Sequence, residues 1–418
     1  MKDTPNKESY DIIVAGAGLA GAAAAWFAAK GGVSVLLVER EKVPGYPTRC
    51  AEGIYFKDTD IEIPQDCIAK LVSGLVLHAP GGEELIFDNI GSGAILHRTK
   101  FIQYLVDNAI SSGAELITEA SVVAVQDCLN HQKSQGNTTI SSDPIEQRSV
   151  TIKTADASFE VKCKILIAAD GIESRLSELA GLKTKLSTNE IEAAYQYRIC
   201  HPGIDPDRLH IYIGRDIAPG GYAWVFPKGD FCANGGLAIC PDLAKGKTAK
   251  EYCDNFIKSK FPEFFGCEGE TRCSIQDPVA GGIPIAVPER IYSDGFMLAG
   301  DAARMVNPLT GAGIGTALFS GKNAGIIAAK AVKAGNCSSA YLKVYQQKWN
   351  KRYGSLHKTM LILANKAKKM SDTRADELIS MLGQVPSEAR TLKSFFITLL
   401  KNKPSLLIKV TKSYLFGS

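Results

Sequence analysis

The sequence predicts an α/β fold with three parts: a buried parallel sheet, an α+β second domain built on an antiparallel sheet, and a helical C-terminal region. Three observations predict it. The N-terminus reads as strand, glycine turn, helix and strand around the run Gly16–Gly21 (G-A-G-L-A-G). Later apolar strands end at Asp170-Gly171 and at Gly300-Asp301. Between them, from Ile191 to Leu237, lie several strand-like stretches that suit an antiparallel sheet.

Composition narrows the function classes. The 418 residues are enough for two or three domains at about 150 residues each. The 48 basic and 44 acidic residues leave a net charge of +4, too small to indicate nucleic-acid binding. Apolar residues make up 45% of the chain, which excludes global disorder. The eleven cysteines show no metal or iron–sulfur spacing, so we expect no metal and reduced thiols in a cytosol.

The uncharged run Ile12–Ala29 has 18 residues, the length of a membrane span. Three glycines interrupt it, and the acidic residues before it argue against a signal peptide. We therefore interpret it as a strand at Tyr10–Ala15, a turn, and a buried helix at Ala20–Lys30, and we expect a cytoplasmic protein.

The other elements are predicted from apolar runs and their periods. Strands are expected at Ser34–Glu39, Leu71–Leu77, Leu116–Val125 and Lys164–Ala169, and helices at His97–Ser112, at Gly311–Lys330 and from Tyr341 onward. The polar segment Cys128–Ser149 is interpreted as an exposed hairpin insertion.

Gly16, Gly18 and Gly21 form G-x-G-x-x-G after a strand and at the start of a helix, as a Rossmann-like dinucleotide-binding turn requires. The second glycine lets backbone N–H groups approach a pyrophosphate, whose charge the helix N-terminus stabilises. Glu39, 18 residues after Gly21, can accept hydrogen bonds from ribose hydroxyls and would repel a 2′-phosphate. NADP is therefore disfavoured here, whereas NAD and FAD stay open. A glycine-rich loop of another α/β protein is the alternative.

Two further motifs favour FAD. Ile165–Arg175 reads as a strand followed by Asp170-Gly171, and Gly295–Ala303 as a strand followed by Gly300-Asp301. With the glycine turn, and in this order, they resemble the FAD-dependent enzymes of the p-hydroxybenzoate-hydroxylase type. The resemblance implies a Rossmann-like FAD domain in which all three motifs, Asp170 included, hold one FAD molecule.

The same resemblance assigns further residues to the cofactor. Asp301 would bind the ribityl chain, and the backbone of Gly313 and Ile314 would lie against the pyrimidine end of the flavin ring. N–H groups at a helix start stabilise the negative charge of a reduced flavin. Arg98 would lie near the cofactor, and Val122 would meet the adenine through its backbone. A solvated helix-start residue and an ordinary core residue are the alternatives for these two.

Tyr222, Trp224 and Phe226 alternate in the run Y-A-W-V-F-P. Residues two apart in a strand share one face, so the three rings predict an aromatic wall for a long apolar ligand or a flavin face. Ordinary core packing is the alternative.

This run, together with Cys50-Ala51-x-Gly53, resembles the geranylgeranyl reductase family, most of all its archaeal lipid-reducing form. The resemblance covers roughly Tyr10 to Tyr353, and the insertion has no counterpart. It implies that Cys50, Ala51 and Gly53 border the flavin and that Ala20 and Glu39 contact the ADP half.

The implied activity is FAD-dependent saturation of isolated C=C bonds in geranylgeranyl chains of archaeal ether-lipid precursors. Reduced flavin would give a hydride and an acid would give a proton. Cys50 is the best-placed acid, because a thiol of pKa about 8.5 stays protonated at pH 7; a small buried hydrophobe is the alternative. Tyr222 is a weaker donor, and Trp224 belongs to the electron-rich wall that would stabilise developing positive charge.

Other functions stay open. A prenyl-diphosphate or chlorophyll-pathway geranylgeranyl reductase would differ only in the head group. An aromatic hydroxylase shares the fold, but the aromatic wall argues against it. A quinone-linked flavoprotein would need cluster ligands, and a lipid carrier would need no redox flavin. Because a second dinucleotide fingerprint is lacking, electrons would come from a ferredoxin-like carrier or from transiently bound NAD(P)H.

The segment Arg390–Ser418 contains six basic residues, no acidic ones and many apolar ones. It could rest on the inner face of an anionic membrane, or cover the core as a C-terminal helix. The predicted domains are an FAD-binding domain (1–70, 95–185 and 275–335), a substrate domain (71–94 and 186–274) and a helical region (336–418).

Overall fold

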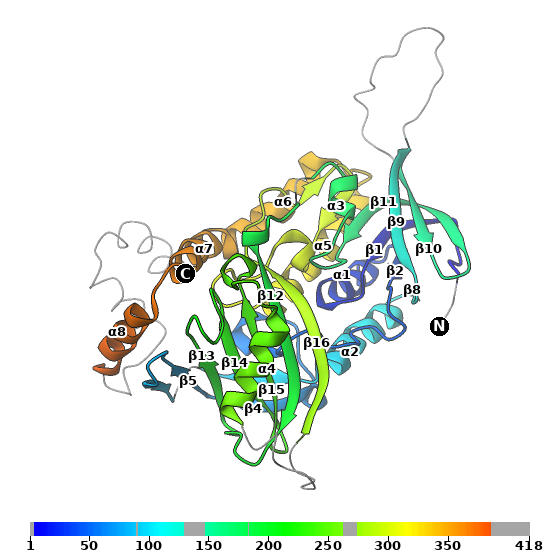
Figure 1. The fold of residues 1–418 in the computed structure, drawn as a ribbon. Coiled ribbons are helices and arrows are strands. Elements are labelled where there is room, and N and C mark those ends of the chain that lie inside the picture. Colours follow the sequence, from blue (N-terminus) through cyan, green and yellow to red (C-terminus); the bar gives the residue numbers. More distant parts are fainter. Residues whose placement is uncertain (1–3, 89–90, 129–146, 183, 262–273, 386–418) are drawn as a thin grey trace, which may run out of the picture.

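The structure is a computed structural model that describes residues 4–88, 91–128, 147–182, 184–261 and 274–385 (Figure 1). Within these residues the strands form three sheets, and residues from these sheets or directly after their strands line one shared cavity.

The strands of the first sheet run in the order β17-β18-β11-β1-β2-β8, with β10 and β9 continuing antiparallel from β11. Their bounds are β1 (Ser9–Ala15), β2 (Val35–Val38), β8 (Ala114–Ile117), β9 (Ser121–Cys128), β10 (Gln147–Lys153), β11 (Ser158–Ala168), β17 (Tyr292–Ser293) and β18 (Phe296–Leu298). β1 pairs in parallel with β2 and β11. The predicted parallel sheet is confirmed.

The second sheet has the order β16-β12-β15-β14-β13-β5-β6 and is antiparallel except between β13 and β5. Its strands are β5 (Gly74–His78), β6 (Glu84–Phe87), β12 (Ile191–Cys200), β13 (Arg208–Tyr212), β14 (Tyr222–Gly229), β15 (Cys232–Ile239) and β16 (Ser274–Pro284). A small third sheet pairs β3 (Gly53–Tyr55) and β4 (Ile68–Val72) with β7 (Gly93–Leu96).

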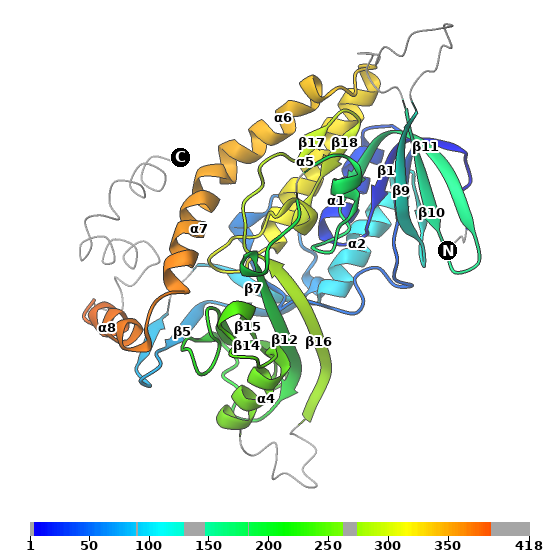
Figure 2. The same ribbon diagram turned by 45° about the horizontal axis from the view of Figure 1, so that its top comes forward.

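The described helices are α1 (Leu19–Lys30), α2 (Arg98–Ser111), α3 (Leu176–Leu179), α4 (Ala249–Lys260), α5 (Ile314–Lys333), α6 (Ser339–Trp349), α7 (Ser355–Ala367) and α8 (Asp372–Gly383). Figure 2 shows α6 and α7 following one another along one side of the molecule, with α8 at their far end.

Helix α1 packs against α2 and α5. The uncharged run Ile12–Ala29 is therefore strand, turn and helix, as predicted. Among the described residues, no helix has the length and apolar character needed to cross a bilayer.

The two faces of the seven-stranded sheet have different partners. Odd-numbered residues of β12, β14 and β15, such as Ile199, Val225 and Leu237, pack with α4 into one core. Residues paired across antiparallel strands point to the same face. Gln196, Gly236 and Trp224 form one such row across β12, β15 and β14, on the face opposite α4.

Two predicted strands need correction. Leu71–Leu77 is not one strand, because β4 ends at Val72 and β5 begins at Gly74 in a different sheet. Leu116–Val125 is likewise divided between β8 and β9. Pairing with different neighbours, which an apolar run does not reveal, decides both breaks. The division into domains stays a prediction; β4 pairs in the third sheet and β16 in the second.

The expectation of reduced thiols is wrong for one pair of cysteines. Cys200 on β12 and Cys232 on β15 form a disulfide. They stand directly opposite each other in antiparallel strands, so the register brings them together across a separation of 32 residues. Their spacing in the sequence carried no sign of this.

Two predicted segments lie outside the described residues. Most of the insertion, residues 129–146, belongs there, although the flanking strands β9 and β10 do pair as a hairpin. The basic segment Arg390–Ser418 also lies there. The helical prediction from Tyr341 onward is confirmed as far as α8.

Candidate active site

A cavity of about 640 Å³ lies between the glycine-turn end of the parallel sheet and the free face of the seven-stranded sheet. Its size is typical of small-molecule sites. Most of the predicted site residues line it: Gly18, Ala20, Cys50, Ala51, Gly53, Arg98, Tyr222, Trp224, Phe226, Asp301, Gly313 and Ile314. Five predicted residues are not part of the lining: Gly16, Gly21, Glu39, Val122 and Asp170.

The glycines of the first motif have different surroundings. A Cβ at Gly16, whose φ is +93°, would lie 2.5 Å from the Ala169 carbonyl oxygen, and one at Gly21 would lie 1.7 Å from the Gly16 carbonyl oxygen. Both positions are closed by backbone. A Cβ at Gly18 would meet nothing within 4 Å, so the chain here faces open space at the start of α1. This is a cradle for a ligand that approaches the backbone.

Glu39 supports this turn from behind. Its side chain is buried, and its two oxygens accept hydrogen bonds from the Ala17 N–H at 2.6 Å and the Glu41 N–H at 2.9 Å. The predicted contact with ribose stays a prediction. Val122 lies in β9, where it pairs with Ile152, and the structure does not bring it to the cavity lining.

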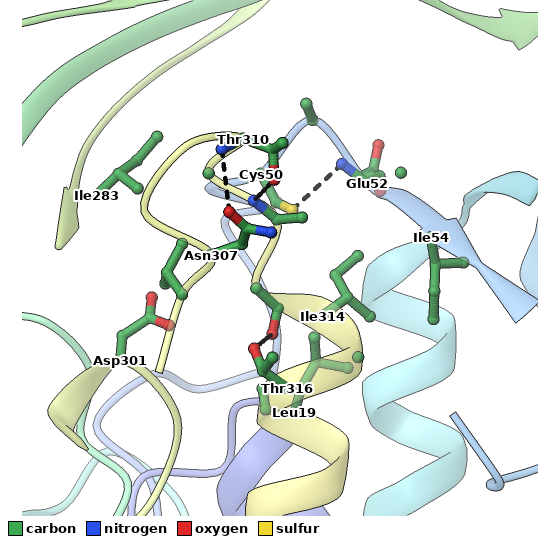
Figure 3. Close-up of a pocket in the computed structure, with 18 of the residues that line it drawn as sticks. Leu19, Cys50, Glu52, Ile54, Ile283, Asp301, Asn307, Thr310, Ile314 and Thr316 are labelled. Atoms are coloured by element: carbon green, nitrogen blue, oxygen red, sulfur yellow. Dashed lines mark hydrogen bonds between the residues drawn. The ribbon is translucent and has the colours of Figure 1, made fainter. Parts of the chain in front are cut away.

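The third motif touches the first. A Cβ at Gly300 would lie 2.9 Å from the Ala20 side chain, and the Gly300 N–H donates to Ser320 Oγ at 3.1 Å. Asp301 follows and points into the cavity (Figure 3). Burial raises the pKa of the Asp301 carboxyl, and the Arg98 guanidinium opposes this rise. The chain thus offers a buried acceptor beside the cradle.

The second motif flanks the same space. Ala169 and Gly171 line the cavity on either side of Asp170. One carboxylate oxygen of Asp170, Oδ1, is buried without a hydrogen-bond partner among the described residues. Burial raises the pKa of this carboxyl. A ligand with hydroxyl groups could supply the missing donor.

The aromatic residues of β14 form a row along the cavity. The ring centroids of Tyr222 and Trp224 are 5.9 Å apart, and those of Trp224 and Phe226 are 6.4 Å apart. The Tyr222 hydroxyl donates to the Thr310 carbonyl oxygen at 2.5 Å, and burial raises the Tyr222 pKa. This row is therefore fixed to the loop that precedes α5.

Cys50 lies in the loop before β3, and Gln196 of β12 connects this loop to the seven-stranded sheet. Its thiol is close to the loop before α5, and its sulfur accepts a hydrogen bond from the Glu52 N–H at 3.2 Å (Figure 3). Burial raises the pKa of the thiol, although Arg98 acts in the opposite direction. The Cys50 thiol is therefore protonated at neutral pH.

Sequence reasoning missed several lining residues. Gln196 donates from Nε2 to the Cys50 carbonyl oxygen at 2.8 Å, and its Oε1 has no partner among the described residues. His357, on α7, is 1% exposed, its Nδ1 is likewise unpaired there, and burial lowers its pKa to about 4. Alternation along β12 could have indicated Gln196; nothing in the sequence indicated His357.

Known proteins resemble this chain over most of its length. A family model described as FAD dependent oxidoreductase matches residues 11–218, and one described as Geranylgeranyl reductase catalytic domain matches residues 190–268. Digeranylgeranylglycerophospholipid reductase 2 of Methanopyrus kandleri is 35% identical over 379 residues, which cover 90% of each chain. The chain belongs to the geranylgeranyl reductase family.

Solved structures agree with this membership. A geranylgeranyl bacteriochlorophyll reductase-like protein of Thermoplasma acidophilum has a TM-score of 0.83 and 28% identity, covering 97% of this chain and 99% of its own. A halogenase in complex with FAD, at 14% identity, has a TM-score of 0.65 and covers 89% of this chain and 79% of its own; it shows the fold alone. The predicted fold is confirmed.

As a geranylgeranyl reductase family member, the chain is an FAD-dependent oxidoreductase. The described residues fit FAD: the open backbone at Gly18 suits a pyrophosphate, and the buried Asp301 carboxylate suits the hydroxyls of a ribityl chain. The start of α5 at Ile314 lines the same cavity, where the first backbone N–H groups of the helix have no partner within the helix.

Proposed function

We propose that this protein saturates isolated C=C bonds of geranylgeranyl chains carried by ether-lipid precursors of archaeal membranes. A single observation carries the proposal. One cavity joins the cofactor residues of the parallel sheet to an apolar surface on the seven-stranded sheet. That surface includes Leu75, Leu209 and Ile211 beyond the aromatic row. It suits a long hydrocarbon chain better than a small aromatic substrate.

The residues proposed to hold FAD are assigned from their places in the cavity and, where they lie outside its lining, from the family resemblance. Gly18 and Ala20 would contact the pyrophosphate, and Asp301 the ribityl hydroxyls. Arg98 and the backbone at Gly313 and Ile314 would lie near the flavin ring. Glu39, Asp170 and Val122 are proposed for the ADP half; Gly16 and Gly21 would shape the turn rather than touch the cofactor. Cys50, Ala51 and Gly53 would border the flavin.

The proposed reaction adds a hydride and a proton across an alkene. FAD, when bound and reduced, supplies the hydride to one carbon. The Cys50 S–H bond breaks to give a proton to the other carbon, and solvent later returns a proton to the sulfur. Tyr222 is the second candidate donor, but its hydroxyl hydrogen is engaged by Thr310.

The aromatic row has an electrostatic role in this proposal. An isolated alkene has no carbonyl to accept electrons, so positive charge develops on carbon as protonation proceeds. The faces of Tyr222, Trp224 and Phe226 can stabilise that charge in the mainly apolar cavity that they line.

The head group is the finer part of the proposal. The relative from Methanopyrus kandleri is named for a digeranylgeranylglycerophospholipid, which supports an ether-lipid substrate. A prenyl diphosphate or a chlorophyll precursor is the alternative, since the apolar surface would take the same chain from each. The electron donor, a ferredoxin-like carrier or NAD(P)H, stays a prediction.

The test is turnover by the reduced holoenzyme. Dithionite-reduced protein is incubated without oxygen with an unsaturated archaeal ether lipid, or with geranylgeranyl diphosphate, and products are weighed by mass spectrometry. We expect the lipid to gain two hydrogens for each bond reduced. If only the diphosphate gains hydrogen, the protein would instead be assigned as a prenyl-diphosphate reductase. If neither substrate gains hydrogen, the proposal is contradicted.

Membrane contact through the basic segment is proposed separately. A chain ending at Glu388 should sediment less with anionic liposomes than the full chain, because it lacks all six basic residues of Arg390–Ser418. Neutral liposomes serve as the control. Equal sedimentation of both chains would remove this segment from membrane binding.

A further inference from the structure

The loop Cys50–Gly53 is held by side chains that come from distant parts of the chain. Gln196 donates to the Cys50 carbonyl oxygen at 2.8 Å, and Asn234 Nδ2 donates to the Ala51 carbonyl oxygen at 3.1 Å. Both donors stand on the seven-stranded sheet. The loop therefore connects the cofactor side of the cavity to the opposite sheet.

Glu52 is the residue at which these connections meet. Its Oε1 accepts the Arg98 N–H at 3.0 Å, and its Oε2 accepts Asn234 Nδ2 at 2.9 Å and pairs with the Lys228 ammonium. Its carbonyl oxygen accepts the Leu96 N–H at 3.0 Å. One side chain thus joins α2 to β14 and β15.

The backbone at Glu52 has an uncommon conformation. Its φ is +68°, in the left-handed region that side-chain-bearing residues seldom adopt. This turn directs the Glu52 side chain into the protein and leaves its N–H donating to the Cys50 sulfur at 3.2 Å. Such a conformation persists where surrounding contacts determine it, and it is typical of functional sites.

The ion pair beneath the loop is almost completely buried. The side chains of Glu52 and Lys228 are 2% and 5% exposed. Replacing a buried ion pair by apolar residues often leaves a fold as stable or makes it more stable, so stability alone is a weak reason for this one. The ion pair lies next to Cys50, because the Glu52 N–H donates to the Cys50 sulfur, and this position indicates a role in the site.

We propose that Glu52 and Lys228 are positioning residues: together they fix the Cys50 loop on the seven-stranded sheet and balance the charge beside its thiol. The inference rests on the proposed function, in which Cys50 is the acid. It adds two residues whose side chains are paired with each other and act on the reaction through the position and protonation state of the acid.

The charges around the thiol define what each residue does. Arg98 lowers the Cys50 pKa, whereas Glu52 and Asp301 raise it together with burial. Around Lys228, burial and Arg198 lower its pKa, and Glu52 and Cys50 raise it. His97 also interacts with both members of the pair. Glu52 and Lys228 therefore act on the thiol with opposite signs.

Opposite signs give a decisive pair of variants. Glu52→Gln removes a negative charge and should lower the Cys50 pKa. Lys228→Met leaves Glu52 unpaired and should raise it. At a pH below the thiol pKa, a shift of about one pKa unit changes the thiolate fraction about tenfold. The double variant removes both charges and should return the pKa toward that of the parent.

The experiment measures the pH dependence of Cys50 alkylation by iodoacetamide in the FAD-loaded protein, read by peptide mass spectrometry. At a fixed pH below the thiol pKa, we expect Glu52→Gln to react about tenfold faster and Lys228→Met about tenfold slower. Alkylation of Cys337, a partly exposed thiol elsewhere, is the internal control. Lys250→Met, which breaks an exposed pair with Asp254 on α4, is the matched control variant.

The outcomes separate cleanly. Opposite shifts that cancel in the double variant support the proposal, and equal reactivity of all variants overturns it. Shifts of the Cys50 pKa in the same direction in both single variants, with FAD still bound, also overturn it. They would mean that each substitution changes the solvent exposure of the loop and not the charge beside the thiol. If a single variant does not fold, the double variant decides, since a parent-like pKa supports charge balance and a displaced one contradicts it.

A failure of the proposed function is distinguishable. If Cys50→Ala turns over lipid at the parent rate, Cys50 is not the acid, yet the opposite shifts in alkylation could still appear. If Cys50 is the acid, the basic limb of the pH–rate profile should move down for Glu52→Gln and up for Lys228→Met. A merely structural role would change the rate without moving that limb.

Discussion

The two sides of the cavity are built by different means. On the parallel-sheet side, the backbone forms the surface: the turn at Gly18, the segment after β18 and the start of α5. On the seven-stranded side, side chains from several strands form it, such as Gln196 and Trp224. In the proposed function, a cofactor common to many proteins would be held by short local motifs, whereas the substrate would contact side chains that come from distant parts of the sequence.

The largest expected effect tests the backbone side. Gly21→Ala would place a Cβ 1.7 Å from the Gly16 carbonyl oxygen, so it should destabilise the fold by about 3 kcal/mol and abolish FAD binding. Gly18→Ala meets no protein atom within 4 Å, so it should keep the melting temperature of the apoprotein and weaken FAD alone. Flavin absorbance and thermal unfolding measure both. If the two variants were equally stable, the backbone around Gly21 would not restrict a side chain more than the open space at Gly18 does.

The next effect tests the junction of the two sides. Cys50→Ala should slow alkene reduction about 100-fold while FAD stays bound, because a general acid contributes about that much. Turnover of the lipid and the flavin spectrum are the measurements. Cys337→Ala, a change of the same kind at a thiol outside the cavity lining, should leave turnover unchanged. Parent-like turnover of Cys50→Ala would remove this residue as the acid.

A smaller effect tests the side-chain surface. Trp224→Ala should lower kcat about 30-fold, the equivalent of ~2 kcal/mol for a desolvated cation–π contact, and leave FAD bound. Phe231→Ala, an exposed aromatic at the turn after β14, is the control. A loss of FAD in Trp224→Ala, rather than of turnover, would show that this row serves the cofactor.

The smallest effect concerns two buried titratable groups near the seven-stranded sheet. Burial raises the Glu192 pKa to about 7 and lowers the His357 pKa to about 4. His357 binds its proton in the unfolded chain near pH 6.5, so its contribution to stability falls as pH decreases from 6.5 to 4. Glu192 keeps its proton to a higher pH in the folded chain than in the unfolded chain. Its contribution to the free energy of unfolding therefore falls as pH rises from 4.5 to 7.

The two slopes oppose each other between about pH 4.5 and 6.5. Glu192→Gln should therefore unmask a rise in unfolding free energy with pH, and His357→Gln a decline, each about 1.4 kcal/mol per pH unit relative to the parent. Urea unfolding at several pH values measures this. Parallel curves for parent and variants would mean that neither group changes its protonation on unfolding.

Prediction from the sequence succeeded where a contact is local. The glycine turn, β1, α1 and the position of Asp301 follow from spacing within short segments, and the alternation of Tyr222, Trp224 and Phe226 shows a shared face. The resemblance to known families then supplied the cofactor. The sequence prediction failed where the pairing of strands decides the structure. Examples are the breaks at Ser73 and between β8 and β9, and the disulfide of Cys200 with Cys232.

By itself, the sequence determined the parallel sheet, the three motifs beside the cavity and the aromatic row, because each depends on a period or a spacing that neighbours in the chain fix. The tertiary structure alone decided that Glu52, Lys228 and Asn234 meet beneath Cys50. These residues lie on separate elements, and the buried Glu52 carboxylate finds its partners, the Lys228 ammonium and the Asn234 amide, only when the register of β14 and β15 brings them together.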